Sequence, residues 1–458
     1  MTQTSKEPTS FRAKVLNSTK MSGIKFGSDV GLRLISTVVL TRLLAPEIYG
    51  VFAVVLVYMF LLEMFSDLGL RSLVLTKEGD VKDSFLRTIW TVSILRGIAI
   101  ALFSITIACA IALMQSHGLF GPESAYNATE LPLAIAALGG AALIMGLQSP
   151  MVFMEERQMR FGKVTLAYVA TNIVALVVTV AMAFYLRSIW ALVLGNVARA
   201  IVHVWLSFIF FKGPAMRLYW NRSELGLVVD RGKWIVGHST LTALSKSADR
   251  LVLGFVMSST TFGFYFIARQ LVDLVMQFLV SVDAQMGLQV FRHLQDSTIE
   301  KFRHNYYRYR LFFDALAGLS AGGLLVLSPL IVGILFDDRY QGVAPIAQIL
   351  IWAILLIGPT LLRGAFSAER RFKEMTQLSV VTAITLWFGL GLAVLVFDSV
   401  TVALVVIALH KIPEAMLITI KSGKRGWITV WREFLGFGFV IIGAALGLLI
   451  LAFLGVFL

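Results

Sequence analysis

Apolar windows long enough to cross a lipid bilayer recur along the whole chain. The hydrocarbon core is about 30 Å thick, so a transmembrane helix needs about 20 predominantly apolar residues. The 458-residue chain contains thirteen such windows, and only 15% of its residues are charged. This combination predicts an all-α polytopic membrane protein. The predicted spans are 22–43, 49–70, 88–114, 131–154, 162–186, 189–211, 234–257, 262–287, 311–335, 343–366, 375–397, 400–420 and 434–457.

The distribution of Lys and Arg predicts how these spans are oriented. Cytoplasmic segments carry an excess of Lys and Arg. With the N-terminus placed in the cytoplasm, only Arg42, Arg187 and Arg339 fall in external loops. The net charge of +13 then reflects topology, basic loops meet anionic membrane lipids, and no nucleic-acid partner is expected. Seven of the 40 Lys and Arg residues are assigned to the spans, and the remaining 30 to cytoplasmic segments; the seven are Lys25, Arg33, Arg96, Arg199, Lys246, Arg250 and Arg269.

The chain contains two similar halves. After the first span, "TRLLAPEIYGVFAVV" leads to "SDLGLRS", and after the seventh, "DRLVLGFVMSSTTFGFYFIA" leads to "VDAQMGLQ". Many transporters are built from such repeats. We therefore predict two parallel six-helix bundles, 1–212 and 234–420, joined by a cytoplasmic linker at 213–233. A basic loop and an extra transmembrane helix follow at 421–458.

These segments, with "MEERQMRFGKV" after the fourth span and "WALVLGNV" in the sixth, resemble the Wzx-type polysaccharide flippases of the multidrug/oligosaccharidyl-lipid/polysaccharide (MOP) exporter superfamily. The resemblance implies a V-shaped transporter whose two bundles enclose a central cavity. It also implies that an undecaprenyl-diphosphate-linked oligosaccharide moves from the cytoplasmic to the outer leaflet of the bacterial inner membrane, for O-antigen, capsule or exopolysaccharide synthesis. Polysaccharide polymerase and chain-length proteins are the partners that it implies.

The segment "GIKFGSDVGLR", residues 23–33, alternates three glycines with Lys25, Asp29 and Arg33 at four-residue spacing. This spacing places bare backbone on one face of a helix and charge on the other. A charged side chain at the bilayer centre costs about 2.5 to 3.5 kcal/mol on insertion scales, so it should face protein or water. We expect Arg33 to face the cavity. For Lys25, snorkelling to the cytoplasmic interface is the alternative.

Other spans also carry charges with helical spacing. Lys246, Asp249 and Arg250 share one face of the seventh span, and Arg269 and Asp273 are four residues apart in the eighth, where an internal ion pair is the alternative role. Deeply embedded cations outnumber deeply embedded acids, which suits a diphosphate because Arg offers it paired hydrogen bonds. The predicted diphosphate-binding residues are Arg33, Lys246, Arg250, Arg269, Arg199, Arg96 and Lys25.

Embedded carboxylates are the groups through which an ion gradient could drive transport, as the resemblance implies. The predicted ion-coupling residues are Asp29, Asp249 and Asp273, with H⁺ or Na⁺ as the coupling ion. No cofactor, metal site or catalytic residue is expected, because the chain has a single cysteine and no phosphate-binding loop or zinc-protease motif. The chain is therefore not expected to be an enzyme.

Three alternatives stay open. A lipid II flippase would need the same cationic groups. A drug or cation antiporter of the same superfamily would need acidic groups for cationic drugs. A membrane polymerase or glycosyltransferase of the same pathway would carry a large external loop or a catalytic acid motif, whereas the longest predicted external loop is the short segment 115–130.

Overall fold

The computed structural model describes residues 11–294 and 298–455, and the regular elements of this part are helices. The described chain divides between Ser247 and Ala248 into two compact units. The division falls inside one long helix, α9 (Arg222–Val256), which begins before the predicted span at 234–257. The predicted domain limits, drawn from transmembrane topology, stay a prediction.

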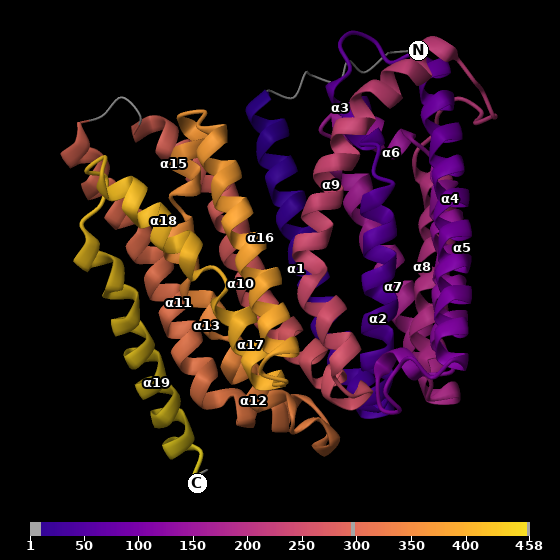
Figure 1. The fold of residues 1–458 in the computed structure, drawn as a ribbon. Helices are drawn as coiled ribbons and strands as arrows, with labels where there is room; N and C mark the ends of the chain where they lie inside the picture. The colour runs from indigo at the N-terminus through magenta and orange to yellow at the C-terminus, as the bar shows by residue number, and fades with distance from the viewer. Residues whose placement is uncertain (1–10, 295–297, 456–458) are drawn as a thin grey trace. The chain divides into compact units, whose positions relative to one another are not determined.

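The first unit contains pairs of long neighbouring helices. α4 lies along α5, α7 lies along α8, and α1 packs against α7 (Figure 1). Short helices α3 and α6 pack together near one end, over an apolar cluster that includes Phe85, Ile89 and Val228. The elements are α1 (Phe11–Leu43), α2 (Pro46–Phe65), α3 (Leu70–Thr76), α4 (Asp83–Ser116), η1 (Ala125–Asn127), α5 (Leu131–Gly146), α6 (Met151–Arg157), α7 (Phe161–Leu186) and α8 (Ile189–Phe210), followed by the first part of α9.

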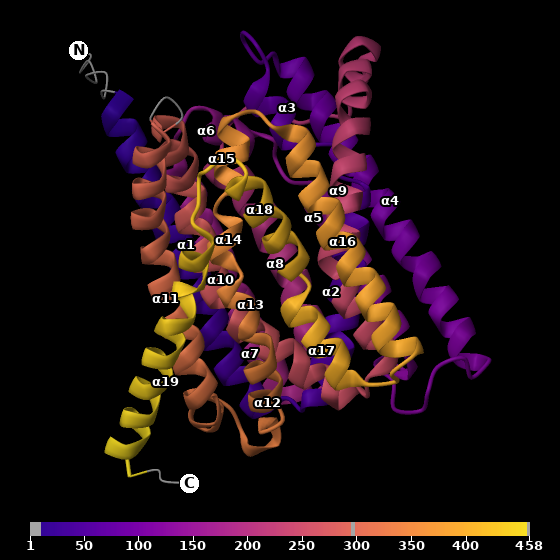
Figure 2. The same cartoon turned by 60° about the vertical axis from the view of Figure 1, so that its left-hand side comes forward.

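The second unit contains two interrupted helical segments (Figure 2). One comprises α12 to α15, and the other comprises α17 and α18. Its elements, after the end of α9, are α10 (Ser259–Leu294), α11 (Ile299–Leu335), η2 (Asp338–Tyr340), α12 (Val343–Leu350), α13 (Trp352–Leu355), α14 (Ile357–Thr360), α15 (Arg363–Ala368), α16 (Phe372–Leu395), α17 (Val400–Leu409), α18 (Ile412–Gly423), η3 (Val430–Phe434) and α19 (Leu435–Phe453).

Ten helices of the described part are long and apolar enough to cross a membrane, or eleven when the bent pair of α5 and α6 counts as one span. The protein is therefore a multi-pass membrane protein. The predicted spans 22–43 and 234–257 fall largely within helices α1 and α9. These two helices are not among the ten because embedded charges interrupt their apolar runs.

Prolines account for the interruptions in the second unit. Pro413 has no backbone N–H to donate to the carbonyl of Leu409, and the helix breaks at His410 and Lys411. Pro359 lies in α14, among the short pieces between Val343 and Ala368. These breaks matter for the site because polar side chains gather beside them.

The C-terminal helix α19 packs closely along α11. A Cβ atom added to Gly322 would overlap the carbonyl oxygen of Val440 and lie 2.7 Å from the nitrogen of Ala444. On the opposing helix, a Cβ added to Gly443 would lie 2.6 Å from the carbonyl oxygen of Leu319. Small residues allow such backbone contact between membrane helices. The extra helix predicted from the sequence is thus an integral part of the second unit.

This packing makes a sharp prediction about two adjacent glycines. Gly322→Ala should lower the melting temperature of the purified protein, because its new methyl group would push α19 off α11. Gly323→Ala is the matched control, because its nearest neighbour would be the Gly443 oxygen at 3.9 Å. Thermal unfolding in detergent measures both variants, and equal melting temperatures would contradict the packing argument.

Candidate functional site

The charges of "GIKFGSDVGLR" meet a tyrosine from another helix. The ammonium of Lys25 lies 4.4 Å from the ring centroid of Tyr168 on α7. The hydroxyl of Tyr168 donates a hydrogen bond of 2.8 Å to Oδ1 of Asp29. A cation over an aromatic face and a hydroxyl on a carboxylate are both favourable. Lys25 and Asp29 are therefore held against α7 by one side chain.

Cations from α4 and α8 extend this cluster. Arg96 donates to Ser66 Oγ at 3.1 Å and to the Glu63 carbonyl at 2.8 Å. The Glu63 carboxylate interacts electrostatically with both Arg96 and Arg199. The charge of Arg199 also interacts electrostatically with Tyr168 and with His203. We call Lys25, Asp29, Glu63, Arg96, Tyr168, Arg199 and His203 the first polar cluster.

Three of the predicted site residues have side chains that make no direct ion pair. Arg33, Arg199 and Lys246 are exposed, and none of these side chains makes a hydrogen bond or ion pair within the described residues. Arg33 follows Lys25 and Asp29 on α1, and Lys246 lies on α9 beside the division between the units. These three cations are therefore available to an anionic ligand.

In the second unit, Arg269 connects two carboxylates. Its Nε donates to Asp273 Oδ1 at 3.0 Å, and its Nη1 lies 3.5 Å from Asp249 Oδ2. Tyr265 also donates its hydroxyl to Asp249, which is buried. Arg250 lies 4.0 Å from Asp273. The structure thus joins all four predicted site residues of this unit, Asp249, Arg250, Arg269 and Asp273, in one group, the second polar cluster, to which Tyr265 also belongs.

One part of the charge assignment is wrong. Lys411 lies inside the predicted span 400–420 and inside the apolar helix Val400–Gly423, so it belongs with the embedded cations and not with a cytoplasmic segment. Counting charges between windows misplaced it. The proline two residues after Lys411 was the available signal of a break within a span.

Sequence reasoning also missed a buried carboxylate at this break. Glu414 is 1% exposed. Arg363 Nε lies 2.5 Å from its Oε1, and the Thr382 hydroxyl donates to its Oε2 at 2.5 Å. The charges of Arg269, Arg363, Asp273 and Glu414 all act on Lys411. Lys411 therefore lies beside the second polar cluster.

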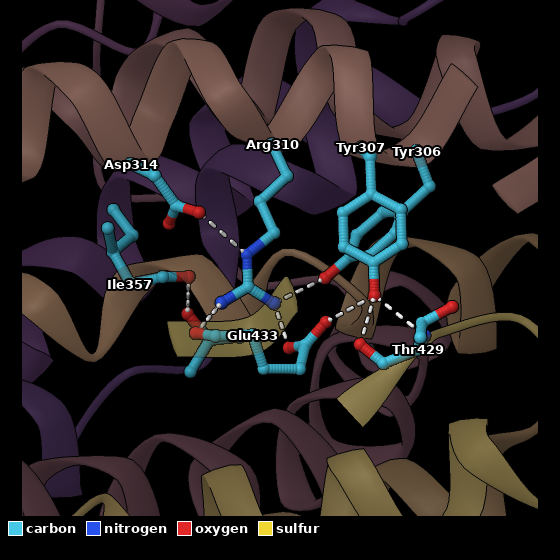
Figure 3. A network of polar contacts seen from close by, with 8 residues as sticks. Tyr306, Tyr307, Arg310, Asp314, Ile357, Thr429 and Glu433 are labelled. Atoms are coloured by element: carbon cyan, nitrogen blue, oxygen red, sulfur yellow. Dashed lines mark hydrogen bonds and ion pairs between the residues drawn. The ribbon is translucent and has the colours of Figure 1, made fainter. Parts of the chain in front are cut away.

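A third group of charges surrounds the buried guanidinium of Arg310 (Figure 3). Arg310 is 2% exposed, and its Nε donates to Asp314 at 3.0 Å. Its terminal nitrogens donate to the Tyr306 hydroxyl at 2.9 Å, to the Glu433 carboxylate and to the Glu433 carbonyl at 3.0 Å. Tyr307 lies 3.0 Å from the same carboxylate. Because each guanidinium nitrogen has an acceptor, this group fastens α11 to the segment before α19 and leaves no positive charge free for an anionic ligand.

No group of three or more His, Cys, Asp or Glu side chains that could hold a metal ion occurs among the described residues.

Comparisons with known proteins indicate a family and a fold. A family model described as "Polysaccharide biosynthesis protein" matches residues 39–345. The chain is 22% identical over 343 residues to lipopolysaccharide biosynthesis protein WzxC of Escherichia coli (strain K12). The matched region covers 74% of this chain and 67% of WzxC.

Two solved structures show the same fold. The lipid II flippase MurJ, in an inward closed conformation, is 14% identical with a TM-score of 0.67, over 93% of this chain and 91% of MurJ. An inward-facing multidrug resistance MATE family transporter of the MOP superfamily is 11% identical with a TM-score of 0.62, over 86% and 94% of the two chains. At these identities the likeness establishes the fold alone.

The Arg310 group generates a stability prediction. Arg310→Met should cost about 3 to 5 kcal/mol of folding free energy, because two carboxylates would remain buried without their partner. Arg308→Met is the control on the same helix, because Arg308 is exposed and makes no ion pair among the described residues. Folded yield and thermal unfolding in detergent measure the difference; an Arg310→Met variant as stable as Arg308→Met would contradict this role.

Proposed function

We propose, from two findings, that the chain flips a lipid-linked oligosaccharide across the membrane. The chain belongs to the polysaccharide biosynthesis protein family, and it has the fold of the MOP-superfamily transporters. The proposed substrate is an undecaprenyl-diphosphate-linked oligosaccharide used in O-antigen, capsule or exopolysaccharide synthesis. The proposed direction is from the cytoplasmic to the outer leaflet of the bacterial inner membrane, with the N-terminus in the cytoplasm.

One observation carries the proposal. Arg33, Arg199 and Lys246 lie in helices of a membrane protein, and none of their side chains makes a hydrogen bond or ion pair among the described residues, although the Glu63 carboxylate acts electrostatically on Arg199. An uncompensated charge in a membrane helix is expensive and is retained where it meets water or a charged ligand. A diphosphate headgroup supplies the missing negative charge and accepts several hydrogen bonds from guanidinium and ammonium groups.

The paired cations have a second proposed role. Lys25, Arg250 and Arg269 already contact aromatic or acidic side chains, and Arg96 donates to the Glu63 carbonyl, so the positions of all four are fixed before a substrate arrives. Preorganised groups bind with a smaller loss of side-chain entropy. We assign these four residues, together with the three unpaired cations, to the path along which the diphosphate moves. The protein as a whole is proposed to open alternately to the two sides of the membrane.

The carboxylates Asp29, Asp249 and Asp273 are the proposed ion-coupling groups. Each lies beside a cation or a hydrogen-bond donor, namely Tyr168, Arg269 or Tyr265. A phosphate that draws Arg269 toward itself would leave Asp249 and Asp273 with less compensation and favour binding of H⁺ or Na⁺. This exchange would couple the movement of the substrate to an ion gradient without a further cofactor.

Three other functions remain as outcomes of the tests. A lipid II flippase would use the same cations, and one neighbour in fold is a protein of that description. A drug antiporter is disfavoured by the unpaired cations, which repel cationic drugs. A polymerase or glycosyltransferase would lengthen the glycan rather than move it. A polysaccharide polymerase and chain-length proteins are proposed as partners downstream of the flippase.

The substrate is tested in proteoliposomes that contain labelled undecaprenyl-diphosphate oligosaccharide. Arg33→Ala, Lys246→Ala and Arg250→Ala should abolish its movement between leaflets while leaving expression intact. Lys163→Ala is the control, because this exposed lysine at the start of α7 makes no ion pair among the described residues. Unchanged movement in all three variants would rule out the cationic route, and movement of lipid II alone would favour the first alternative.

The coupling groups are tested by imposing a proton or sodium gradient on the same vesicles. Asp29→Asn, Asp249→Asn and Asp273→Asn should remove stimulation by the gradient, since the amide cannot ionise. Asp398→Asn is the control, because Asp398 is exposed at a left-handed backbone position (φ 42°) that asparagine tolerates. If all three variants still respond like the unaltered protein, these carboxylates do not couple transport to the gradient.

A further inference from the structure

Lys411 is a membrane-embedded cation to which neither the sequence nor the comparisons assign a role. It lies near the middle of the Val400–Gly423 span, at the break between α17 and α18 (Figure 2). The side chain is partly buried. In the described part of the chain it forms no hydrogen bond and no ion pair.

The two carboxylates whose charges act on Lys411 are already paired with other cations. Glu414 lies 2.5 Å from Arg363 and also accepts the Thr382 hydroxyl. Asp273 lies 3.0 Å from Arg269. Lys411 thus experiences attraction from two acids that are satisfied elsewhere and repulsion from two guanidinium groups.

The other embedded cations of the second unit do not share this situation. Arg269 lies between Asp249 and Asp273, and Arg250 lies 4.0 Å from Asp273. Arg310 lies between Asp314 and Glu433. Arg363 is paired with Glu414. Of these five cations, Lys411 alone makes no ion pair in the described part of the chain.

The local backbone keeps Lys411 at this depth. Pro413 interrupts the helix, and the His410 ring nitrogen Nδ1 lies 2.7 Å from the carbonyl of Ile407. A lysine at a helix end can snorkel to the interface, but one near the centre of a 24-residue span cannot reach it from either side. Its charge needs water or an anionic ligand.

We propose that Lys411 is the phosphate-binding group of the second unit, with Arg269 and Arg363 at its sides as preorganised donors. The proposal rests on the proposed function and adds to it the residue that binds a phosphate of the lipid diphosphate. A phosphate group supplies the negative charge that Asp273 and Glu414, already paired with Arg269 and Arg363, do not give to Lys411. Lysine is suited to this contact because its compact ammonium can donate to several phosphate oxygens.

Direct binding to the purified full-length protein tests the assignment. The probes are farnesyl diphosphate, farnesol and inorganic pyrophosphate, and calorimetry in detergent measures their affinities. Lys411→Gln should weaken the binding of farnesyl diphosphate by about tenfold or more, as expected for the loss of a hydrogen-bonded charge. Lys411→Arg should retain most of the affinity for farnesyl diphosphate. Farnesol, which has no phosphate, should bind with equal affinity to Lys411→Gln and to the unaltered protein.

Lys424→Gln is the matched control. Lys424 follows the end of the same helix, is exposed and makes no ion pair within the described residues. It should bind farnesyl diphosphate as the unaltered protein does. Pyrophosphate should compete with farnesyl diphosphate for the site. A lower affinity for pyrophosphate than for farnesyl diphosphate would identify the ligand as a lipid headgroup rather than free phosphate.

A stability measurement separates a binding role from a structural one. Lys411→Gln should keep or raise the melting temperature, because no carboxylate loses its partner. Arg269→Gln should lower it, because Asp249 and Asp273 would lose theirs. A Lys411→Gln variant that melts as early as Arg269→Gln, or that binds farnesyl diphosphate as the unaltered protein does, would overturn the proposal while leaving the proposed function standing. Failure of the unaltered protein to bind any diphosphate would overturn both.

Discussion

The cost of a charge inside a membrane is the constraint on which this structure depends. Where a charge is needed only for structure, the protein surrounds it with acceptors, as at Arg310 with Asp314 and Glu433. Where a charge has no such surroundings, its cost has to be met by water or a ligand. The pairing of each embedded charge therefore separates structural groups from candidates for substrate binding.

Interrupted helices place these charges at useful depths. The break at His410 and Lys411 puts a lysine inside a span, and Glu414 follows it on α18, beside Arg363 of α15. A regular apolar helix would have excluded such groups. The same unit is held rigid by close backbone packing, since Gly322 of α11 and Gly443 of α19 leave no room for a side chain. Firm packing around a local break lets polar groups keep fixed positions in an apolar layer.

Contacts within one helix were predictable, and contacts between helices were not. The four-residue spacing of Arg269 and Asp273 already indicated the ion pair that forms at 3.0 Å. The spacing of Lys25 and Asp29 indicated a shared face but not the Tyr168 ring that holds both. Arg310 and Glu433 are 123 positions apart, and nothing in their local sequence pairs them. Lys411 lies within the predicted span 400–420, but the apolar window did not show that the helix breaks there.

By itself, the sequence determined the membrane environment, the approximate spans and the family resemblance, because hydropathy and local spacing are properties of contiguous residues. The tertiary structure alone decided which charges are neutralised and which remain free. That distinction depends on helices brought together from distant parts of the chain: α7 against α1, α15 beside α18, and α19 along α11. A charge carries the same letter in the sequence whether or not a carboxylate lies beside it, and only packing places that carboxylate.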